Sequence, residues 1–359
     1  MLPARRLRWI IAVLAVVGVL AGEGAGVAQA APKLEVMTRN MYLGADLTPV
    51  LQAQTPAQFL AAAGQAFTTV QASDPPERIK AMAREIAAAD PAIVGLQEVE
   101  LWQTDTEPPT LDGPATPANS TRYDFLQLLL DALAAQGTPY TEVTTATNAA
   151  NEVPTSLGFD VKLTDRDVLL AKSSLSSKEL SWSNASSANF AANLTVTTGV
   201  GSITITRGYN VADFTAKKRP FRLVNTHLEP SADQIQDAQA VELLNGVLSS
   251  TTQTQLLVGD INSDPGETGT NPYDLFAGAG FADSWTQANP TAAGLTCCFG
   301  ELLLDADASV FSSRIDVVLT RGANKAAKAA RIFGIDPNNR TPSGLWPSDH
   351  AGVSSTVAP

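Results

Sequence analysis

Short apolar runs of β type, each ending in side chains that carry carboxylate or amide oxygen, limit the fold of this chain more than any other feature. Three of them are Leu34 to Thr38 leading to Asn40, Ile93 to Leu96 leading to Gln97 and Glu98, and Leu256 to Val258 leading to Gly259, Asp260, Ile261 and Asn262. A fourth, Val317 to Leu319, opens with Ile315 and Asp316. In α/β proteins ligands bind beyond the carboxyl ends of strands. We therefore expect these polar side chains to converge on one rim of a sheet.

Helical patterns lie between these runs. Residues 79–86 follow the 3.6-residue period of an amphipathic helix that ends at Asp90 and Pro91, and residues 123–136 predict another. Ser231 with Gln234 resembles a capping box for a third helix, which continues to Leu248. Residues 193–206, which turn through Gly199 and Gly201, predict a hairpin. The Thr- and Pro-rich residues 104–121 and the Ser- and Asn-rich residues 173–189 are interpreted as surface loops.

Histidine is scarce, and its placement is informative. The chain has only two histidines, His227 in Asn225-Thr226-His227 and His350 in Ser348-Asp349-His350. Imidazole moves protons near pH 7, and both residues have polar or acidic neighbours. Taken singly, each histidine fits a hydrogen-bonded structural residue better than a catalyst. Their combination with the oxygen-rich strand ends favours an active site with a hard cation.

Six short motifs follow one another in a recognisable order: Asn40; Gln97-Glu98-Val99; Asn225-Thr226-His227; Gly259-Asp260-Ile261-Asn262; Arg314-Ile315-Asp316; and Ser348-Asp349-His350. Over residues 34–357 this succession resembles the endonuclease/exonuclease/phosphatase superfamily, which includes deoxyribonuclease-like and neutral sphingomyelinase-like enzymes. The resemblance implies an α/β four-layer sandwich, with two β-sheets packed face to face and helices on the outside. It also implies that residues 31–359 form one catalytic domain.

The resemblance further implies a role for each motif residue. Asn40, Glu98 and Asp349 would hold Mg²⁺, with Mn²⁺ as the alternative metal. His350 would take the proton from the attacking water, with Asp316 fixing the tautomer of its ring. Asp260 and Asn262 would orient the nucleophile, and His227 would bind a phosphoryl oxygen or protonate the leaving group.

Each of these residues also has a structural interpretation. The segment from Asp260 to Gly266 has the composition of a turn, and Asp316 could simply pair with Arg314. Tyr42 stands where several relatives carry an acidic residue, so a second metal ligand from that segment is in doubt. The partner of His227 also stays open between Asp165 and Asp167, which share one face of an extended strand.

The N-terminus predicts export. Arg5, Arg6 and Arg8 precede an apolar run from Trp9 to Leu20, and Ala28-Gln29-Ala30 has the pattern of a cleavage site. Together these features are typical of a secretory signal peptide at residues 1–30, and the apolar run is shorter than the ~20 residues of a membrane span. We expect a secreted, extracellular enzyme that begins near Ala31, has no transmembrane anchor and is a monomer.

The charge balance bears on the substrate. Removing residues 1–30 takes away three arginines and Glu23, which changes the net charge from −12 to −14. Proteins that grip nucleic acid mainly by charge carry a basic footprint, so the acidic balance weakens but does not exclude a nuclease. Lys217-Lys218-Arg219 is a candidate basic patch, whereas the 193–206 hairpin lacks the Trp that favours insertion into a bilayer. We therefore expect a phosphodiesterase, with nucleic acid favoured over phospholipid as substrate. A phosphomonoesterase, or a non-catalytic binding protein on the same fold, is the alternative.

The two cysteines, Cys297 and Cys298, are adjacent. An even number of cysteines in an exported protein is compatible with a disulfide, and two free thiols are the alternative. Zinc is disfavoured because the spacing is wrong and neither histidine is near in sequence. No catalytic role is predicted for the pair.

Overall fold

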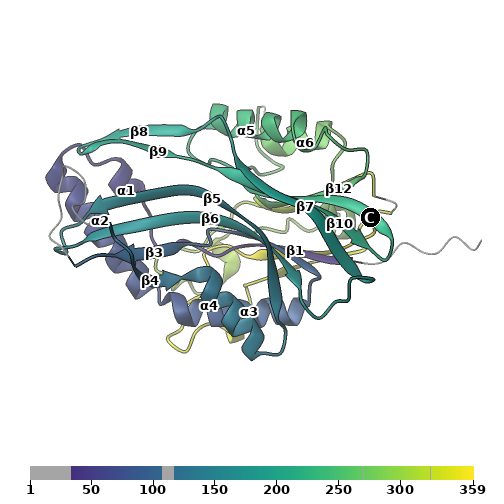
Figure 1. The fold of residues 1–359 in the computed structure, drawn as a ribbon, viewed down its shortest axis with the longest axis horizontal. Helices are drawn as coiled ribbons and strands as arrows, with labels where there is room; N and C mark the ends of the chain where they lie inside the picture. Colours follow the sequence, from purple (N-terminus) through teal and green to yellow (C-terminus); the bar gives the residue numbers. More distant parts are fainter. Residues whose placement is uncertain (1–33, 107–116, 270, 324) are drawn as a thin grey trace, which may run out of the picture. The chain divides into compact units, whose positions relative to one another are not determined.

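The computed structural model describes residues 34–106, 117–269, 271–323 and 325–359, so the predicted signal peptide lies outside the described residues. Most of the described strands belong to two large β-sheets, which are packed face to face and flanked by helices (Figure 1). This arrangement confirms the predicted α/β sandwich. Among these residues, no helix has the length and apolar character that crossing a bilayer requires.

The first sheet has eight described strands and carries both the first and the last motif. Its order is β15-β16-β1-β2-β6-β3-β4, with β5 also paired to β6. The strands are β1 (Leu34–Asn40), β2 (Ile93–Gln97), β3 (Leu101–Thr104), β4 (Ser120–Asp124), β5 (Tyr140–Pro154), β6 (Asp160–Lys172), β15 (Ala329–Phe333) and β16 (Gly352–Val357). Strands β1 and β2 are parallel, so their carboxyl ends lie side by side.

The second sheet has six described strands in the order β13-β14-β12-β11-β10-β7. They are β7 (Leu180–Asn189), β10 (Gly208–Ala216), β11 (Arg219–His227), β12 (Thr254–Asp260), β13 (Ala282–Asp283) and β14 (Asp316–Arg321). Strands β11 and β12 are parallel, whereas β14 is antiparallel to β12. The carboxyl ends of β11 and β12 therefore meet the amino end of β14. The predicted hairpin forms from β8 (Leu194–Thr198) and β9 (Gly201–Ile205).

Successive side chains of a strand point to opposite faces of its sheet, so neighbouring residues belong to different hydrophobic cores. Val36 faces the second sheet, while its neighbour Met37 faces the helices on the outside. In the second sheet, Leu256 lies in the core between the sheets and Leu257 packs under the opposite helices. Because both faces of these central strands are buried, their sequences are nearly continuous apolar runs.

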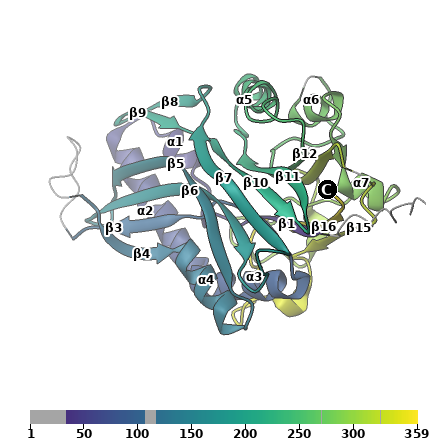
Figure 2. The same ribbon diagram turned by 45° about the vertical axis from the view of Figure 1, so that its right-hand side comes forward.

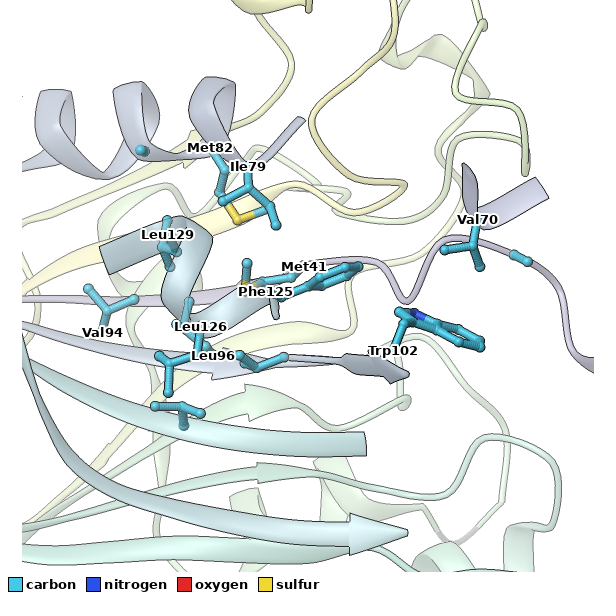
Figure 3. Packing of buried hydrophobic residues seen from close by; sticks show 14 of the residues in the cluster. Met41, Val70, Ile79, Met82, Val94, Leu96, Trp102, Phe125, Leu126 and Leu129 are labelled. Atoms are coloured by element: carbon cyan, nitrogen blue, oxygen red, sulfur yellow. The ribbon is translucent and has the colours of Figure 1, made fainter. Parts of the chain in front are cut away.

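Helices cover the outer face of each sheet. Helices α3 and α4 lie on one side of the sandwich, and α5 and α6 lie on the other (Figure 1). The close-up in Figure 3 shows Ile79 and Met82 of α3 pointing toward Met41 and Phe125. The helices are α1 (Thr48–Leu51), α2 (Pro56–Ala72), α3 (Pro75–Ala89), α4 (Phe125–Ala135), α5 (Asp233–Asn245), α6 (Pro272–Gly278) and α7 (Ser284–Ala288), with 3₁₀ turns at Ala308–Val310 and Pro337–Asn339.

Three local predictions were wrong. Residues 180–189 form strand β7, which pairs with β10 (Figure 2), and their Ser- and Asn-rich composition reflects an edge strand whose side chains face solvent. Residues 123 and 124 end strand β4, and the helix begins only at Phe125. Helix α5 has Ala232 at its N-cap without a side-chain cap, and it ends at Asn245 rather than Leu248. The capping box therefore does not form.

An amide network joins the two sheets. The Gln97 side chain of the first sheet donates to Asn225 Oδ1 of the second at 2.7 Å, and Asn225 Nδ2 donates to the Leu96 carbonyl at 3.1 Å. A Cβ atom on Gly95 would lie 2.4 Å from Asn225 Oδ1, so only glycine allows this close approach. Asn225 thus serves the sheet interface, although it belongs to a motif that suggested chemistry.

Candidate active site

The rim predicted from the strand ends exists, and both sheets contribute to it. Asn40 ends β1, and Glu98 directly follows β2 in the first sheet. His227 ends β11, Asp260 ends β12, and Asp316 begins β14 opposite Asp260 in the register of the second sheet. The fold thus brings together the carboxylates, amide and imidazoles that lie far apart in the sequence.

Asn40 connects the two halves of the site. Its Nδ2 lies 3.1 Å from both Glu98 Oε1 and Asp260 Oδ2, while its Oδ1 accepts a hydrogen bond from the Tyr42 backbone at 2.8 Å. The side chain therefore holds two carboxylates in place by donating to them. Its oxygen retains a second lone pair, which can still serve a cation.

The carboxylates of the rim suit a divalent metal. Burial and the neighbouring Asp349 raise the pKa of Glu98 to about 7, and burial likewise raises the pKa of Asp349. Glu98 also adopts a positive φ of 54°, which non-glycine residues keep only where the surroundings hold them there. Two half-buried carboxylates beside an amide oxygen form the hard donor set that Mg²⁺ and Mn²⁺ prefer. The residues Glu98, Asp349 and Asn40 therefore fit the metal predicted from the sequence.

This electrostatic arrangement predicts how pH affects the metal-free protein. The folded pKa of Glu98 lies above its unfolded value, so the folded state binds the proton more tightly and stability falls as pH rises from about 4.5 through about 7. Mg²⁺ binding to the ionised carboxylate should reverse this loss. We expect Mg²⁺ to raise the melting temperature more at pH 8 than at pH 5.5, as measured by thermal unfolding. Equal increases at both pH values, or an unchanged effect in Glu98→Gln, would contradict the assignment.

His350 pairs with Asp316. Its Nδ1 lies 2.9 Å from Asp316 Oδ2 and 3.7 Å from Asp260 Oδ2. Burial alone would lower the pKa of His350, but Asp316, Asp260 and Asp349 together raise it well above its usual value. These carboxylates therefore favour the protonated form of the ring. The predicted contact between Asp316 and His350 is present, whereas Arg314 pairs with Asp283 rather than Asp316.

The cysteines lie against this histidine. Cys297 and Cys298 form a vicinal disulfide, and their sulfurs lie 3.8 Å and 3.9 Å from His350 Nε2. Backbone pairing of Cys297 with His350 and Ser313 brings them there. The inference from sequence that no histidine lies near the pair was therefore wrong, because the neighbour is 53 residues away in the chain.

The surroundings of His227 shift its pKa in the opposite direction from that of His350. Arg207 Nη1 lies 3.0 Å from His227 Nδ1, and His227 Nε2 lies 3.6 Å from Asp260 Oδ2. Burial and the charge of Arg207 lower the pKa of His227 well below its usual value. A guanidinium only donates hydrogen bonds, so Nδ1 must be the acceptor and the proton resides on Nε2. His227 is thus a neutral hydrogen-bond donor that faces the centre of the site.

Neither proposed partner of His227 touches its ring. Asp165 Oδ2 lies 3.4 Å from Arg207, and Asp167 accepts a hydrogen bond from Asn148 at 2.9 Å. Asp165 therefore acts on His227 only through Arg207, a residue that the sequence analysis did not select.

The side chain of Asn262 is held by a hydrogen bond, since its Nδ2 donates to the Leu228 carbonyl at 3.0 Å. Its second N–H and its oxygen remain for a nucleophile.

Comparison with known proteins identifies the family. The sequence profile of the endonuclease/exonuclease/phosphatase family matches residues 63–350. The chain belongs to this family. The predicted resemblance is therefore confirmed, and with it the assignment to a family of hydrolases that act on phosphoesters. A search of curated protein sequences found no match.

Solved structures of this family share the fold. A family protein from Bacteroides thetaiotaomicron is 15% identical with a TM-score of 0.56, over 91% of this chain and 98% of the other. A mannosyl-6-phosphatase from the same organism is 15% identical with a TM-score of 0.55, over 90% and 99%. D. rerio TDP2 complexed with a single-strand DNA product is 15% identical with a TM-score of 0.53, over 90% and 98%. At this identity the likeness concerns the fold alone.

Buried arginines hold the family motifs in position. Arg78 of α3 is fully buried and donates to the carbonyls of Met41 at 3.0 Å and Pro347 at 2.8 Å. It thereby joins the segment after Asn40 to the segment before Asp349. Arg39, paired with Glu85 at 3.0 Å, also donates to the His350 carbonyl. Sequence reasoning missed both, because an arginine in an amphipathic helix or a strand normally indicates a solvent-facing position.

The predicted basic patch does not border the site. Lys217 and Lys218 form the turn between β10 and β11, and Arg219 begins β11. His227 is the last residue of that strand, so the patch lies about 26 Å away at ~3.3 Å per residue. The role predicted for Lys217-Lys218-Arg219 in a groove around the active site is therefore wrong.

The contact between Arg207 and His227 leads to a test. Glu229 Oε2 lies 3.7 Å from Arg207 Nε, so two carboxylates, Asp165 and Glu229, contact this guanidinium. In Arg207→Gln the positive charge that lowers the pKa of His227 is lost while both carboxylates remain, so we expect this pKa to rise. Arg207→Lys should keep much of the effect because it keeps the charge. The chain has only two histidines, so NMR titration of the ring resonances can follow each, with His350→Ala supplying the assignment. An unchanged His227 titration in Arg207→Gln would contradict the role of Arg207.

Proposed function

We propose that this protein is a secreted, Mg²⁺-dependent phosphodiesterase that cleaves its substrate by direct attack of water. The observation that carries the proposal is the placement of Asp260 between two histidines of opposite electrostatics. His227 is neutral, the carboxylates around His350 favour its protonated form, and both rings lie within 3.7 Å of the same Asp260 oxygen. A phosphate diester requires charge neutralisation, a positioned water and a proton donor, and these three needs match this set of groups.

The roles proposed here for Asp260 and His350 differ from those that the family resemblance implied. Burial raises the pKa of Asp260 to about 6, while the charge of His350 opposes this rise. Asp260 is therefore mostly ionised at neutral pH yet basic enough to take a proton from water, as a general base must be. In this proposal His350, whose protonated form the neighbouring carboxylates favour, gives its proton to the leaving oxygen. His227 donates from Nε2 to a phosphoryl oxygen.

Glu98, Asp349 and Asn40 hold the metal ion in this proposal. When bound, the ion neutralises the negative charge of the phosphate diester and of the carboxylate cluster. Asn40 keeps Glu98 and Asp260 at fixed positions, so the metal ligand and the base remain aligned.

A panel assay tests the reaction. Mature protein with Mg²⁺ is offered bis(p-nitrophenyl) phosphate, p-nitrophenyl phosphate, DNA, RNA, sphingomyelin and inositol phosphates. We expect the diesters to be cleaved much faster than the monoester, and Asp260→Asn to be the matched inactive control. Faster cleavage of p-nitrophenyl phosphate would identify a phosphomonoesterase, and no turnover of any substrate would favour a binding protein.

Export has a separate test. If residues 1–30 are a signal peptide, the protein recovered from the medium of an expressing culture should begin at Ala31, as measured by N-terminal mass spectrometry. Full-length protein retained with the cells would contradict export.

A further inference from the structure

A cavity of about 250 Å³ opens beside the proposed metal site. Its polar lining includes Glu98, Asp165 and Arg207, which are described above around the proposed metal site and His227, together with Glu100 and Glu229. The rest of the lining is mainly apolar and includes Leu43, Leu47, Phe67, Trp102, Leu163 and Ile203. A ligand held at the metal site can therefore extend directly into apolar surroundings.

Hydrogen bonds of the Leu43 backbone connect Glu98 to the apolar lining of the cavity. The Leu43 backbone N–H donates to Glu98 Oε2, and the Leu43 carbonyl accepts from Trp102 Nε1 at 3.1 Å. Trp102 packs against Phe67 of α2, with ring centroids 5.8 Å apart. Figure 3 shows Trp102 beside Val70 of the same helix. The apolar wall is thus fixed to the carboxylate that is proposed to hold the metal.

The β8–β9 hairpin forms another wall of the cavity. Gly199 N–H donates to the Ala53 carbonyl at 2.7 Å, and a Cβ atom on Gly199 would lie 2.3 Å from the Thr55 backbone. The hairpin tip therefore rests directly on the segment between α1 and α2. Along β9, Ile203 and Ile205 line the cavity, while Thr204 between them is exposed. The hairpin that seemed unsuited to enter a bilayer instead turns its apolar face toward the active site.

We propose that this cavity binds an alkyl chain of the substrate, which makes the substrate a lipid-like phosphate diester rather than a nucleic acid. The inference rests on the proposed phosphodiesterase function and specifies its substrate class. Each methylene buried in such a cavity should tighten binding about two- to fourfold.

A nucleobase in the same place would lose free energy. Its ring edge carries several donors and acceptors, and each one left unpaired against apolar lining weakens binding. Leu43, Leu163 and Ile203 offer no side-chain partners for them, and polar lining residues such as Glu100, Asn151 and Glu229 are a minority. The remote position of the Lys217-Lys218-Arg219 turn also removes the basic surface that was expected to hold a nucleic acid backbone. Both observations favour the alkyl chain.

Binding of alkylphosphonates tests the cavity without turnover, because their P–C bond resists hydrolysis. Ethyl-, hexyl- and decylphosphonate are titrated into the mature protein with Mg²⁺ by isothermal calorimetry. We expect the Kd to fall about two- to fourfold per added methylene until the cavity is full, in line with the transfer free energy of a methylene. Equal Kd values for the three compounds would overturn the proposal.

Variants on neighbouring residues of β9 locate the effect. Ile205→Trp, which fills the cavity without adding charge, should remove the dependence on chain length. Thr204→Trp places the same side chain on the exposed face and should preserve it. Should Ile205→Trp fail to fold, Ile205→Ala should still weaken decylphosphonate binding relative to wild type while leaving ethylphosphonate unchanged. Retained chain-length dependence in a folded Ile205→Trp protein would also overturn the proposal.

Measuring the turnover of different diesters tests the lipid assignment separately from the proposed phosphodiesterase function on which it rests. Dihexanoylphosphatidylcholine below its micelle concentration should be cleaved with a higher kcat/KM than a thymidine dinucleotide, with bis(p-nitrophenyl) phosphate as the general diester. Cleavage of the general diester with preference for the dinucleotide overturns the lipid assignment alone. No cleavage of any diester, even with chain-dependent phosphonate binding, overturns the proposed function and the substrate assignment with it.

Discussion

Replacing His350 with alanine should lower turnover about 100-fold or more, in keeping with the loss of a general acid. The pH dependence should change as well. The charge of His350 lowers the pKa of Asp260, so its removal should move the acidic limb of the kcat/KM profile, expected near pH 6, to higher pH. Measuring kcat/KM from pH 4.5 to 9 on bis(p-nitrophenyl) phosphate tests both effects.

The same experiment distinguishes the two candidate bases. If His350 were the base, as the family resemblance implied, the acidic limb would belong to its ring and would vanish in His350→Ala. If Asp260 is the base, the limb vanishes in Asp260→Asn and only shifts in His350→Ala. Asp316→Asn is a milder control because it leaves the ring in place and disturbs only its tautomer and charge. Thermal unfolding of each variant shows whether the fold is retained.

Removing the metal should abolish activity altogether. Asp349 is close enough to Glu98 to raise the pKa of Glu98, and without a cation the charge of the two carboxylates would repel a phosphate diester. Excess chelator should therefore reduce hydrolysis to background, and Mg²⁺ or Mn²⁺ should restore it. Hydrolysis is followed by release of p-nitrophenolate.

A matched pair of variants assigns that effect to the predicted ligands. Glu98→Gln should raise the Mg²⁺ concentration needed for half-maximal activity, since it replaces a charged ligand with a neutral one of the same shape. Glu301→Gln changes a carboxylate that accepts a hydrogen bond from the Asp46 backbone N–H at 3.0 Å, in the loop after Tyr42, and it should leave this concentration nearly unchanged. Full activity of the wild type in excess chelator would refute the metal assignment.

The rim of the site could be predicted from the sequence because strand geometry determines it. Asn40, Glu98 and Asp260 each end or follow an apolar run, and parallel neighbouring strands place such residues together. The pairing of Asp316 with His350 came from the family resemblance, and the structure has that contact. The catalytic roles of these residues remain predictions until the variants are measured.

What the sequence could not supply depends on contacts between distant segments. Arg207 reaches His227 because β10 returns alongside β11, and nothing in the local pattern of a Thr- and Gly-rich hairpin indicates this contact. The disulfide beside His350 likewise depends on a bridge between residues 297 and 350. Strand β7 was mistaken for a loop because an exposed edge strand lacks the apolar alternation by which strands are recognised.

The position of Asn225 at the sheet interface has a consequence for how this enzyme loses activity. Glu98 and Asn40 belong to one sheet, while His227, Asp260 and Asp316 belong to the other, so the site is assembled only across the interface that Gln97 and Asn225 join. A slip of one sheet past the other by a fraction of a residue would separate the proposed metal ligands from the proposed base and leave every strand intact. We therefore expect activity to depend on the alignment of the two sheets, and inactivation to precede any loss of secondary structure.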